Sequence, residues 1–303
     1  MSGSGEPVRR CGFVALVGAP NAGKSTLLNR FVGSKVSIVT PKVQTTRTRV
    51  TGICIAGDAQ IVFVDTPGIF RPRRRLDRAM VAAAWAGARD ADAIVVLVDA
   101  HRGIDDDAGR IIDGLRASGR KAALALNKID LVKREVLLPL AARLDETGVF
   151  SDVFMISARD GDGVDDLRDF LAARLPIGPW LYPEDQLSDM PLRLLAAEVT
   201  REKFFLHLRQ ELPYGLAVET ESWQERADGS LRVDQVVYVA REGHKPIVLG
   251  KGGSRIKDIG SVARRELEAL LERRVHLFLR VKVAPKWLDD PERYRDLGLE
   301  FPR

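Results

Sequence analysis

The stretch Gly18-Ala-Pro-Asn-Ala-Gly-Lys-Ser25 decides the fold of the first half of this chain. It fits the pattern G-x-x-x-x-G-K-[ST], ends the apolar run Phe13–Gly18 and opens the helical pattern Lys24–Phe31. Glycines in such a loop let backbone N–H groups surround a phosphate, and the following helix adds the positive partial charge of its N-terminus. Lys24 would reach the β- and γ-phosphates, and Ser25 would bind Mg²⁺. The stretch therefore predicts a phosphate-binding loop between a buried strand and a helix.

On both sides of this loop, short apolar runs alternate with helical patterns. The runs that predict strands are Phe13–Gly18, Val50–Ile55, Ile61–Asp65, Ala93–Asp99, Ala122–Asn127 and Val153–Ser157. The patterns that predict helices are Lys24–Phe31, Leu76–Arg89, Asp105–Ala117, Glu135–Thr147 and Val164–Leu175. Continuously apolar strands are typical of a sheet buried on both faces. The alternation therefore favours an α/β sheet with helices on both sides.

A second unit follows a segment that interrupts this pattern. The interruption holds Pro176, Gly178, Pro179, Pro183 and Pro191 within sixteen residues, which predicts a linker because proline neither continues a helix nor pairs in a central strand. The elements expected after it are a helix at Arg193–Glu211, strands at Tyr214–Gln224 and Leu231–Arg241 around the turn Asp228-Gly229, a helix at Lys245–Leu249, the loop Gly250–Gly253, a helix to about Arg273 and a strand at Val275–Val283.

Composition and charge narrow the class of protein. The chain has 303 residues, of which 45% are hydrophobic and 29% charged, and these values exclude disordered and collagen-like chains. Its two cysteines, Cys11 and Cys54, cannot form a disulfide framework, which favours a reducing, cytoplasmic compartment. Between Arg241 and Lys286 there are 12 Lys or Arg against 5 Asp or Glu, and the rest of the chain carries 35 basic and 37 acidic residues. The whole positive excess therefore lies in one stretch, as expected of a module that meets a polyanion.

Two further motifs follow strands of the first half. Asp65-Thr-Pro-Gly68 closes the run Ile61–Asp65, where a carboxylate can hold Mg²⁺ through water and the Gly68 N–H can contact the γ-phosphate. Asn127-Lys-Ile-Asp130 ends the next-but-one run, and the Asp130 carboxylate can accept from N1–H and N2–H of guanine, which adenine cannot match.

The remaining side chains of this edge complete a guanine site. Asn127 would contact the base or brace the loop, the Lys128 stem would cover the base, and Ser157-Ala158 would offer an N–H to the guanine oxygen. Ligands bind at the carboxyl ends of the strands in such sheets. The predicted nucleotide-binding set is Gly18, Asn21, Ala22, Gly23, Lys24, Ser25, Thr26, Asp65, Asn127, Lys128, Asp130, Ser157, Ala158 and Arg159. We therefore expect GTP and GDP as ligands.

With these motifs, the second half resembles a known family. Ile247-Val-Leu-Gly-Lys-Gly-Gly-Ser-Arg-Ile-Lys-Asp-Ile-Gly260 resembles the G-x-x-G core of a KH domain. Together with Pro41-Lys-Val-Gln-Thr-Thr-Arg47 and Glu211-Leu-Pro-Tyr214, it resembles the Era GTPase family from about Arg10 to Lys286. The resemblance implies an α/β P-loop GTPase domain at 1–178, a linker at 179–191 and an α+β type II KH domain at 192–303.

The family's activity would be GTP hydrolysis, its RNA the small-subunit (16S) ribosomal RNA near the 3′ end, and its process assembly of the 30S particle. The resemblance also implies peripheral association with the inner membrane, which nothing in this sequence displays. We expect a monomer.

The predicted RNA-binding residues gather around the second glycine-rich loop. A G-x-x-G loop clamps the backbone of about four nucleotides, and its glycines let the RNA approach the main chain. Ile247, Val248 and Ile256 would form an apolar floor for the bases. The set that we expect to bind RNA is Ile247, Gly250, Lys251, Gly252, Gly253, Arg255 and Lys257.

Hydrolysis must proceed without the usual glutamine. Ile69 follows the D-x-x-G turn where many GTPases have a Gln that orients water, and an aliphatic side chain cannot do this. In related GTPases with a G-x-P-N-x-G-K-S loop, the Asn binds K⁺, and Asn21 matches that position. The resemblance further implies that Thr46, rather than Thr45, binds Mg²⁺ in the GTP state. The predicted catalytic set is Asn21, Lys24, Thr46 and Gly68, with Ser25, Thr46 and Asp65 (through water) at Mg²⁺ and Asn21 at K⁺.

Two other functions remain open from the sequence. The chain can be a nucleotide-dependent RNA-binding module with negligible intrinsic hydrolysis, which Ile69 keeps open. It can also be a membrane-associated signalling GTPase whose basic stretch meets anionic lipid, although lipid needs no G-x-x-G clamp.

Overall fold

The computed structural model describes residues 8–43, 45–210, 212–285, 287, 290–296 and 298–302. The segment Met1–Pro7 and the motif residues Gln44, Glu211 and Lys286 lie outside this set. The described chain forms two compact units. The first contains the chain up to Ser37, Thr46–Asp189 and the residues from Gly298 onward, and the second contains Ile38–Thr45 and the chain from Met190 to the last helix.

A six-stranded sheet forms the centre of the first unit. Its order is β2 (Val50–Ala56), β3 (Ala59–Asp65), β1 (Arg10–Gly18), β4 (Ala93–Asp99), β5 (Ala122–Asn127) and β6 (Phe150–Ile156). Only β2, at one edge, runs antiparallel to its neighbour. The register places Leu16 beside Asp65, and Asp99 beside Asn127. The carboxyl ends of the five parallel strands therefore meet at one edge of the sheet, as the sequence predicted.

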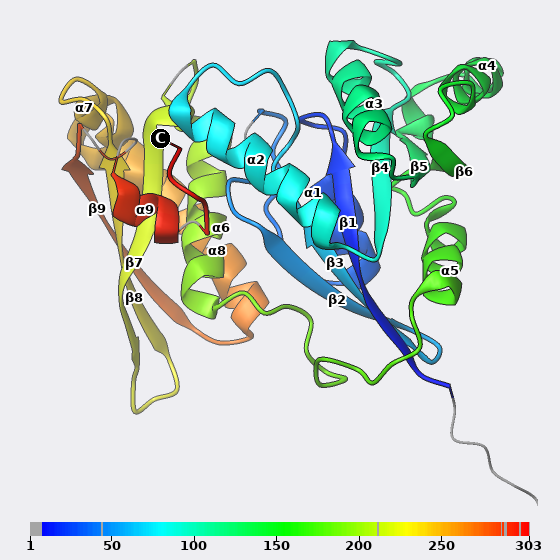
Figure 1. Cartoon of the computed structure of the whole chain (residues 1–303). Coiled ribbons are helices and arrows are strands. Elements are labelled where there is room, and N and C mark those ends of the chain that lie inside the picture. Colours follow the sequence, from blue (N-terminus) through cyan, green and yellow to red (C-terminus); the bar gives the residue numbers. More distant parts are fainter. Residues whose placement is uncertain are drawn as a thin grey trace, which may run out of the picture. The chain divides into compact units, whose positions relative to one another are not determined.

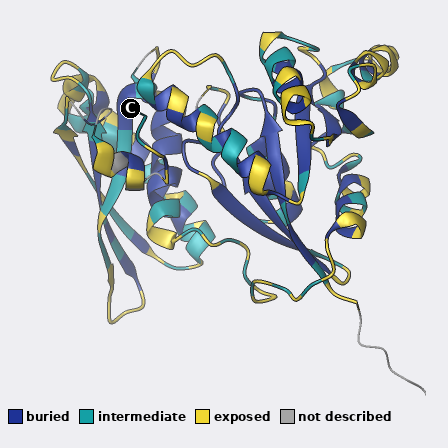
Figure 2. Ribbon diagram, viewed as in Figure 1, coloured by how far each residue is buried: buried dark blue, intermediate teal, exposed yellow. Residues whose placement is uncertain are grey.

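Five helices cover both faces of this sheet (Figure 1). They are α1 (Lys24–Val32), α2 (Arg75–Asp90), α3 (Asp106–Ser118), α4 (Arg134–Asp145) and α5 (Val164–Arg174). Ala88 of α2, Ile111 of α3 and Leu140 of α4 share a buried cluster with Val96 and Leu124 of the sheet. Helices α1 and α5 contact β2 and β3 and each other. Figure 2 shows strands β1 to β5 largely buried and the outer sides of the helices exposed, which confirms the predicted α/β class.

The second unit is a three-stranded sheet with helices. Its elements, in chain order, are α6 (Leu192–His207), β7 (Leu216–Glu225), β8 (Leu231–Val239), α7 (His244–Leu249), α8 (Ser254–Leu271), β9 (Val275–Val283) and α9 (Pro291–Asp296). Strand β8 lies in the middle, antiparallel to β7 and parallel to β9. Helices α6 and α8 bury Val199 and Leu267 against Val233 and Val275. The order helix–strand–strand–helix–helix–strand is the one expected of a type II KH domain.

Some element ends differ from the prediction. Helix α6 stops at His207, four residues before the expected end, and the short 3₁₀ turn Pro213–Gly215 precedes β7. Strand β6 begins at Phe150 rather than Val153, and α9 was not predicted. The other 3₁₀ turns are Ile129–Leu131 and Lys251–Gly253. None of the helices in the described part of the chain is long and apolar enough to cross a membrane.

The proline-rich segment is bound to the first sheet as far as Asp189. Gln60 of β3 accepts hydrogen bonds through Oε1 from the N–H groups of Leu181 (2.9 Å) and Tyr182 (3.0 Å), and its Nε2 donates to the Tyr182 carbonyl at 2.8 Å. Farther on, Ser188 Oγ donates to the Thr51 carbonyl at 2.6 Å. Although this segment forms neither helix nor strand, Leu181 and Tyr182 therefore satisfy backbone groups against the sheet.

We expect Leu267→Ala to destabilise the second unit, because Leu267 is 1% exposed and joins α8 to β8 and β9. The cavity should cost about 2–5 kcal/mol of unfolding free energy. Hydrogen exchange should show faster exchange of β8 and β9 amides, while β1 and β4 stay protected. Leu206→Ala on α6, where the side chain is 47% exposed, is the control and should leave exchange nearly unchanged. Equal exchange in both variants would contradict the assignment.

Candidate functional site

The loop between β1 and α1 wraps around a buried lysine. Lys24 is 6% exposed, and its Nζ donates to the carbonyls of Gly18 (3.1 Å) and Ala19 (3.0 Å). Asn21 and Gly23 adopt left-handed backbone, with φ of 64° and 102°. Such a curl can direct successive backbone N–H groups to one side, where an anion binds. The loop is therefore shaped for phosphate, as its sequence predicted.

Beside the loop, the hydroxyls of Ser25 and Thr46 lie against the carboxylate of Asp65. Ser25 Oγ donates to Asp65 Oδ2 at 2.6 Å, and Thr46 Oγ1 lies 3.0 Å from Ser25 Oγ and 3.4 Å from Asp65 Oδ2. The other oxygen, Asp65 Oδ1, is buried and accepts no hydrogen bond from the described residues. Hydroxyl and carboxylate oxygens are the ligands that Mg²⁺ takes, so this donor set fits the ion. Thr45, in contrast, bonds to Thr40 through its hydroxyl at 2.6 Å.

Burial shifts the titration of both charged groups in this cluster. It lowers the pKa of Lys24 to about 8, against the opposing attraction of Asp65. It also raises the pKa of Asp65, against the attraction of Lys24 and the hydrogen bonds of Ser25, Ser37 and Thr46. Desolvation thus disfavours each charge more than its neighbours favour it. A phosphate at Lys24 and a cation at Asp65 would each restore the charged form.

Asn127 joins the phosphate loop to the loop after β6. It is 1% exposed, its Nδ2 donates to the Ala22 carbonyl at 2.8 Å, and its Oδ1 accepts from the Ala158 N–H at 3.0 Å. A Cβ on Gly23 would lie 2.2 Å from Asn127 Nδ2, so only glycine fits there. Of the two roles left open by the sequence, the structure gives Asn127 the bracing one. The Ala158 N–H, expected to reach the guanine oxygen, is bonded to Asn127.

The predicted base-reading groups lie together after β5 and β6. Ser157 Oγ donates to Asp130 Oδ1 at 2.7 Å, and Arg159 pairs with Asp130 Oδ2 at 3.1 Å. Lys128 has left-handed backbone, with φ of 65°, and its Nζ pairs with Asp99 Oδ2 at 2.6 Å. Both oxygens of the Asp130 carboxylate are thereby oriented. This is the group that would accept from N1–H and N2–H of guanine.

The turn after β3 packs on the phosphate loop. A Cβ on Gly68 would lie 2.9 Å from the Pro20 nitrogen, so glycine is required for this close approach. The Ile69 N–H donates to the Gly18 carbonyl at 3.1 Å, and its side chain is 3% exposed in the cluster under α2 and α3. Ile69 therefore points into the core and cannot orient water.

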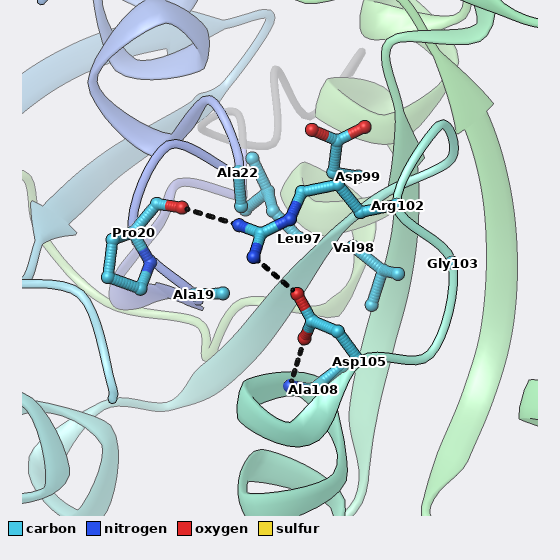
Figure 3. A pocket seen from close by; sticks show the side chains of 10 residues that line it. All are labelled: Ala19, Pro20, Ala22, Leu97, Val98, Asp99, Arg102, Gly103, Asp105 and Ala108. Carbon is cyan, nitrogen blue, oxygen red and sulfur yellow. Dashed lines mark hydrogen bonds and ion pairs between the residues drawn. The ribbon is translucent and has the colours of Figure 1, made fainter. Parts of the chain in front are cut away.

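Three residues that brace the site were not found from the sequence. Arg102, after β4, donates to the Pro20 carbonyl at 3.5 Å while pairing with Asp105, which caps α3 through the Ala108 N–H (Figure 3). Arg30 of α1 donates to the carbonyls of Ala158 and Arg159. Ser37 donates to Asp65 Oδ2 at 3.0 Å. The contacts of Arg102 with Pro20, of Arg30 with Ala158 and of Ser37 with Asp65 join residues that are far apart in the sequence. No local sequence pattern predicts such contacts.

The second glycine-rich loop joins α7 to α8. Gly250, Gly252 and Gly253 have φ of 74°, 59° and 80°, which side chains with a Cβ rarely adopt. A Cβ on Gly250 would lie 2.9 Å from the Arg255 nitrogen. Lys251, Arg255 and Lys257 are exposed, and Arg255 donates to the Ile247 carbonyl at 2.5 Å. The loop thus presents open main chain and positive charge.

The apolar floor expected beside this loop is smaller than predicted. Ile247 is 44% exposed and Ile256 is half-buried, so both can meet a base. Val248 is 0% exposed and belongs to the core under β7 and β8. The interpretation of Val248 as a base contact is therefore wrong, because the helical turn points it inward while its neighbour points outward.

Comparisons with known proteins agree with both halves. The family model described as "50S ribosome-binding GTPase" matches residues 13–128, and the model described as "KH domain" matches residues 211–288. GTPase Era of Sinorhizobium medicae is 61% identical over 97% of this chain and 95% of its own length. GTPase Era of Agrobacterium fabrum is 61% identical over 97% of this chain and 93% of its own length.

Two solved structures are similar over nearly the whole chain. A variant of Era from Aquifex aeolicus bound to GDP and AlF₄⁻ has a TM-score of 0.90 and 40% identity, covering 95% of this chain and 99% of its own. Era in complex with MgGDPNP and nucleotides 1506–1542 of 16S ribosomal RNA has a TM-score of 0.91 and 40% identity, covering 96% of this chain and 99% of its own.

We expect Asn127→Ala to weaken binding of GTP and GDP alike, by roughly tenfold or more. The change leaves the Ala22 carbonyl and the Ala158 N–H without their buried partner, so both loops lose their shared brace. Titration with fluorescent analogues of both nucleotides measures the effect. Leu138→Ala, at a side chain that is 71% exposed, is the control. Wild-type affinity for both nucleotides in Asn127→Ala would contradict the bracing role.

Proposed function

Because this chain belongs to the Era family of GTPases, we propose that it is a GTP-hydrolysing switch that binds 16S ribosomal RNA and assists assembly of the 30S particle. The observation that carries the proposal is the near-complete match to Era solved with MgGDPNP and 16S ribosomal RNA. Support also comes from the buried cluster of Lys24, Ser25, Thr46 and Asp65 in one unit and the exposed GKGG loop in the other. In covalent order, we propose residues 1–178 as the GTPase domain, 179–191 as the linker and 192–303 as the KH domain. By their contacts, Ile38–Thr45 groups with the second unit and the residues from Gly298 onward group with the first.

In this proposal the first unit binds GTP at the edge where its parallel strands end. Backbone N–H groups of the loop from Gly18 to Gly23 hold the phosphates, and Lys24 pairs with them in place of the two carbonyls that it now contacts. Asp130 reads the guanine edge while Ser157 and Arg159 hold the carboxylate in place. Ala22 in the loop and Thr26 in the first turn of α1 would lie beside the phosphates.

Mg²⁺ would be held by Ser25 and Thr46, with Asp65 behind water. When bound, the ion neutralises charge on the β- and γ-phosphates. We further propose that Asn21 binds K⁺, because the loop has the sequence pattern G-x-P-N-x-G-K-S. Gly68 presents its N–H to the γ-phosphate from the turn that packs on Pro20. Ile69 leaves no side chain to orient water, so the rate depends on charge stabilisation at the phosphates.

The second unit would bind the RNA backbone. Gly250 to Gly253 let the phosphates approach the main chain, and Lys251, Arg255 and Lys257 supply positive charge. Ile247 and Ile256 meet the bases. We propose that the protein works as a monomer in the cytoplasm, with peripheral association with the inner membrane as a second location.

Single-turnover GTP hydrolysis in potassium and in sodium, with and without the 3′ end of 16S ribosomal RNA, tests the switch. We expect hydrolysis at least about tenfold faster in potassium, because a cation at Asn21 stabilises charge that develops in the transition state. Asn21→Ala should remove this dependence and leave the sodium rate. Equal wild-type rates in both salts would overturn the cation site. Nucleotide binding without hydrolysis would leave a nucleotide-dependent RNA binder.

Lys251→Ala should weaken binding of the same RNA and reduce the slope of log affinity against log salt by about 1, since one phosphate contact is lost. Lys121→Ala, at an exposed lysine just before β5, is the control and should leave the slope unchanged. A salt series of RNA titrations measures both. An unchanged slope in Lys251→Ala would place the RNA elsewhere.

A further inference from the structure

We call the segment Ile38–Thr45 the arch. It connects Ser37 and Thr46, whose hydroxyls both lie next to the Asp65 carboxylate. Ser37, just before the arch, donates from Oγ to Asp65 Oδ2 at 3.0 Å. Thr46, just after it, places Oγ1 3.4 Å from the same oxygen and 3.0 Å from Ser25 Oγ. The two residues that flank the arch therefore contact the same carboxylate. The arch itself belongs to the second unit.

Helix α6 holds the arch near its middle. The Val39 N–H donates to Glu202 Oε1 at 2.8 Å. Lys42 Nζ donates to the carbonyls of Phe205 and Leu208, at the C-terminal end of α6. The last carbonyls of a helix lack partners within it and carry negative partial charge, so an ammonium group is a favourable cap. Lys42 thus both satisfies the helix end and fastens the arch to it.

A buried guanidinium fixes the end of the arch that precedes Thr46. Arg201 Nη2 donates to the Thr45 carbonyl. The Arg201 side chain is 2% exposed and pairs with Glu198, with contacts of 2.5 and 2.7 Å. A buried, paired guanidinium has little freedom to move, because separating it from its carboxylate would leave two buried charges unpaired. It therefore holds the peptide that joins Thr45 to Thr46 in one place.

Hydrogen bonds also join described residues of the arch to one another. Thr45 Oγ1 donates to the Lys42 carbonyl at 2.8 Å and lies 2.6 Å from Thr40 Oγ1, while the Lys42 N–H donates to Thr40 Oγ1 at 3.2 Å. These bonds link the position of Lys42 to that of Thr45. Each of these contacts lies inside the second unit, so they share its stability.

We propose that helix α6 positions Thr46 for the GTP state by holding the arch through Lys42, Glu202 and Arg201, which act as positioning residues. The inference rests on the proposed function, in which Thr46 binds Mg²⁺ only with GTP. Since α6 restrains the arch in advance, the entropy of ordering Thr46 is not lost when GTP binds. The affinity for GTP, and not that for GDP, then depends on contacts made inside the second unit.

Lys42→Met in the full chain tests this. We expect the affinity of this variant for MgGDPNP to fall by roughly tenfold and its affinity for GDP to stay unchanged. The reason is that the charge-assisted contact between the arch and the end of α6 is lost. Val39→Pro removes the N–H that Glu202 accepts and should act in the same direction. Lys42→Arg keeps a donor and should restore affinity. Lys121→Met, at an exposed lysine outside the arch, is the matched control, and thermal unfolding checks that each variant folds.

A double-mutant cycle with Thr46→Val separates positioning from general damage. If Lys42 acts through the Thr46 hydroxyl, Lys42→Met should lower MgGDPNP affinity little further in the Thr46→Val background. An undiminished loss there, equal losses for GDP and MgGDPNP, or no loss at all would overturn the inference. Wild-type protein that binds neither nucleotide would overturn the proposed function as well, so the two failures are told apart by the wild type alone.

Discussion

The buried carboxylate of Asp65 is the group on which the arrangement of the first unit depends. Its Oδ2 interacts with the hydroxyls of Ser25 in α1, of Ser37 just before the arch and of Thr46 just after it. A buried carboxylate is costly unless it is compensated, so the segments that bring these hydroxyls are held where they can meet it. The compensation is incomplete, because Oδ1 has no partner among the described residues. The unpaired Oδ1 lowers stability but remains available to a cation, as is common at functional sites.

The two glycine-rich loops solve the same physical problem at different depths. Both use positive φ at glycine to open the main chain to phosphate. In the first, Lys24 is 6% exposed, whereas Lys251 in the second is exposed. A desolvated lysine interacts strongly with one enclosed phosphate and is little screened by salt, while an exposed lysine meets a backbone that passes over the surface. Burial, more than the motif itself, therefore separates a mononucleotide site from a polynucleotide one.

Local features of the fold could be predicted, and contacts between distant segments could not. The strand, loop and helix around Gly23 follow from periodicity and from a motif whose residues are adjacent. The link from Gln60 to Tyr182 spans 122 residues, and the contact of Arg30 with Ala158 spans 128. No pattern in the sequence encodes such pairs. Val248 was misjudged for a related reason, since a six-residue helix gives too little periodicity to tell its inner from its outer side.

The arch shows why domain boundaries drawn along a sequence can mislead. Ile38–Thr45 lies between two segments of the first unit, yet the Val39 N–H, the Lys42 ammonium and the Thr45 carbonyl bond to α6, more than 150 residues away. A segment exchanged in this way belongs to one unit by covalent order and to the other by its contacts. The chain passes back from the second unit to the first at the peptide between Thr45 and Thr46. Arg201, which is buried and paired with Glu198, donates to the Thr45 carbonyl and so holds this peptide from the side of the second unit.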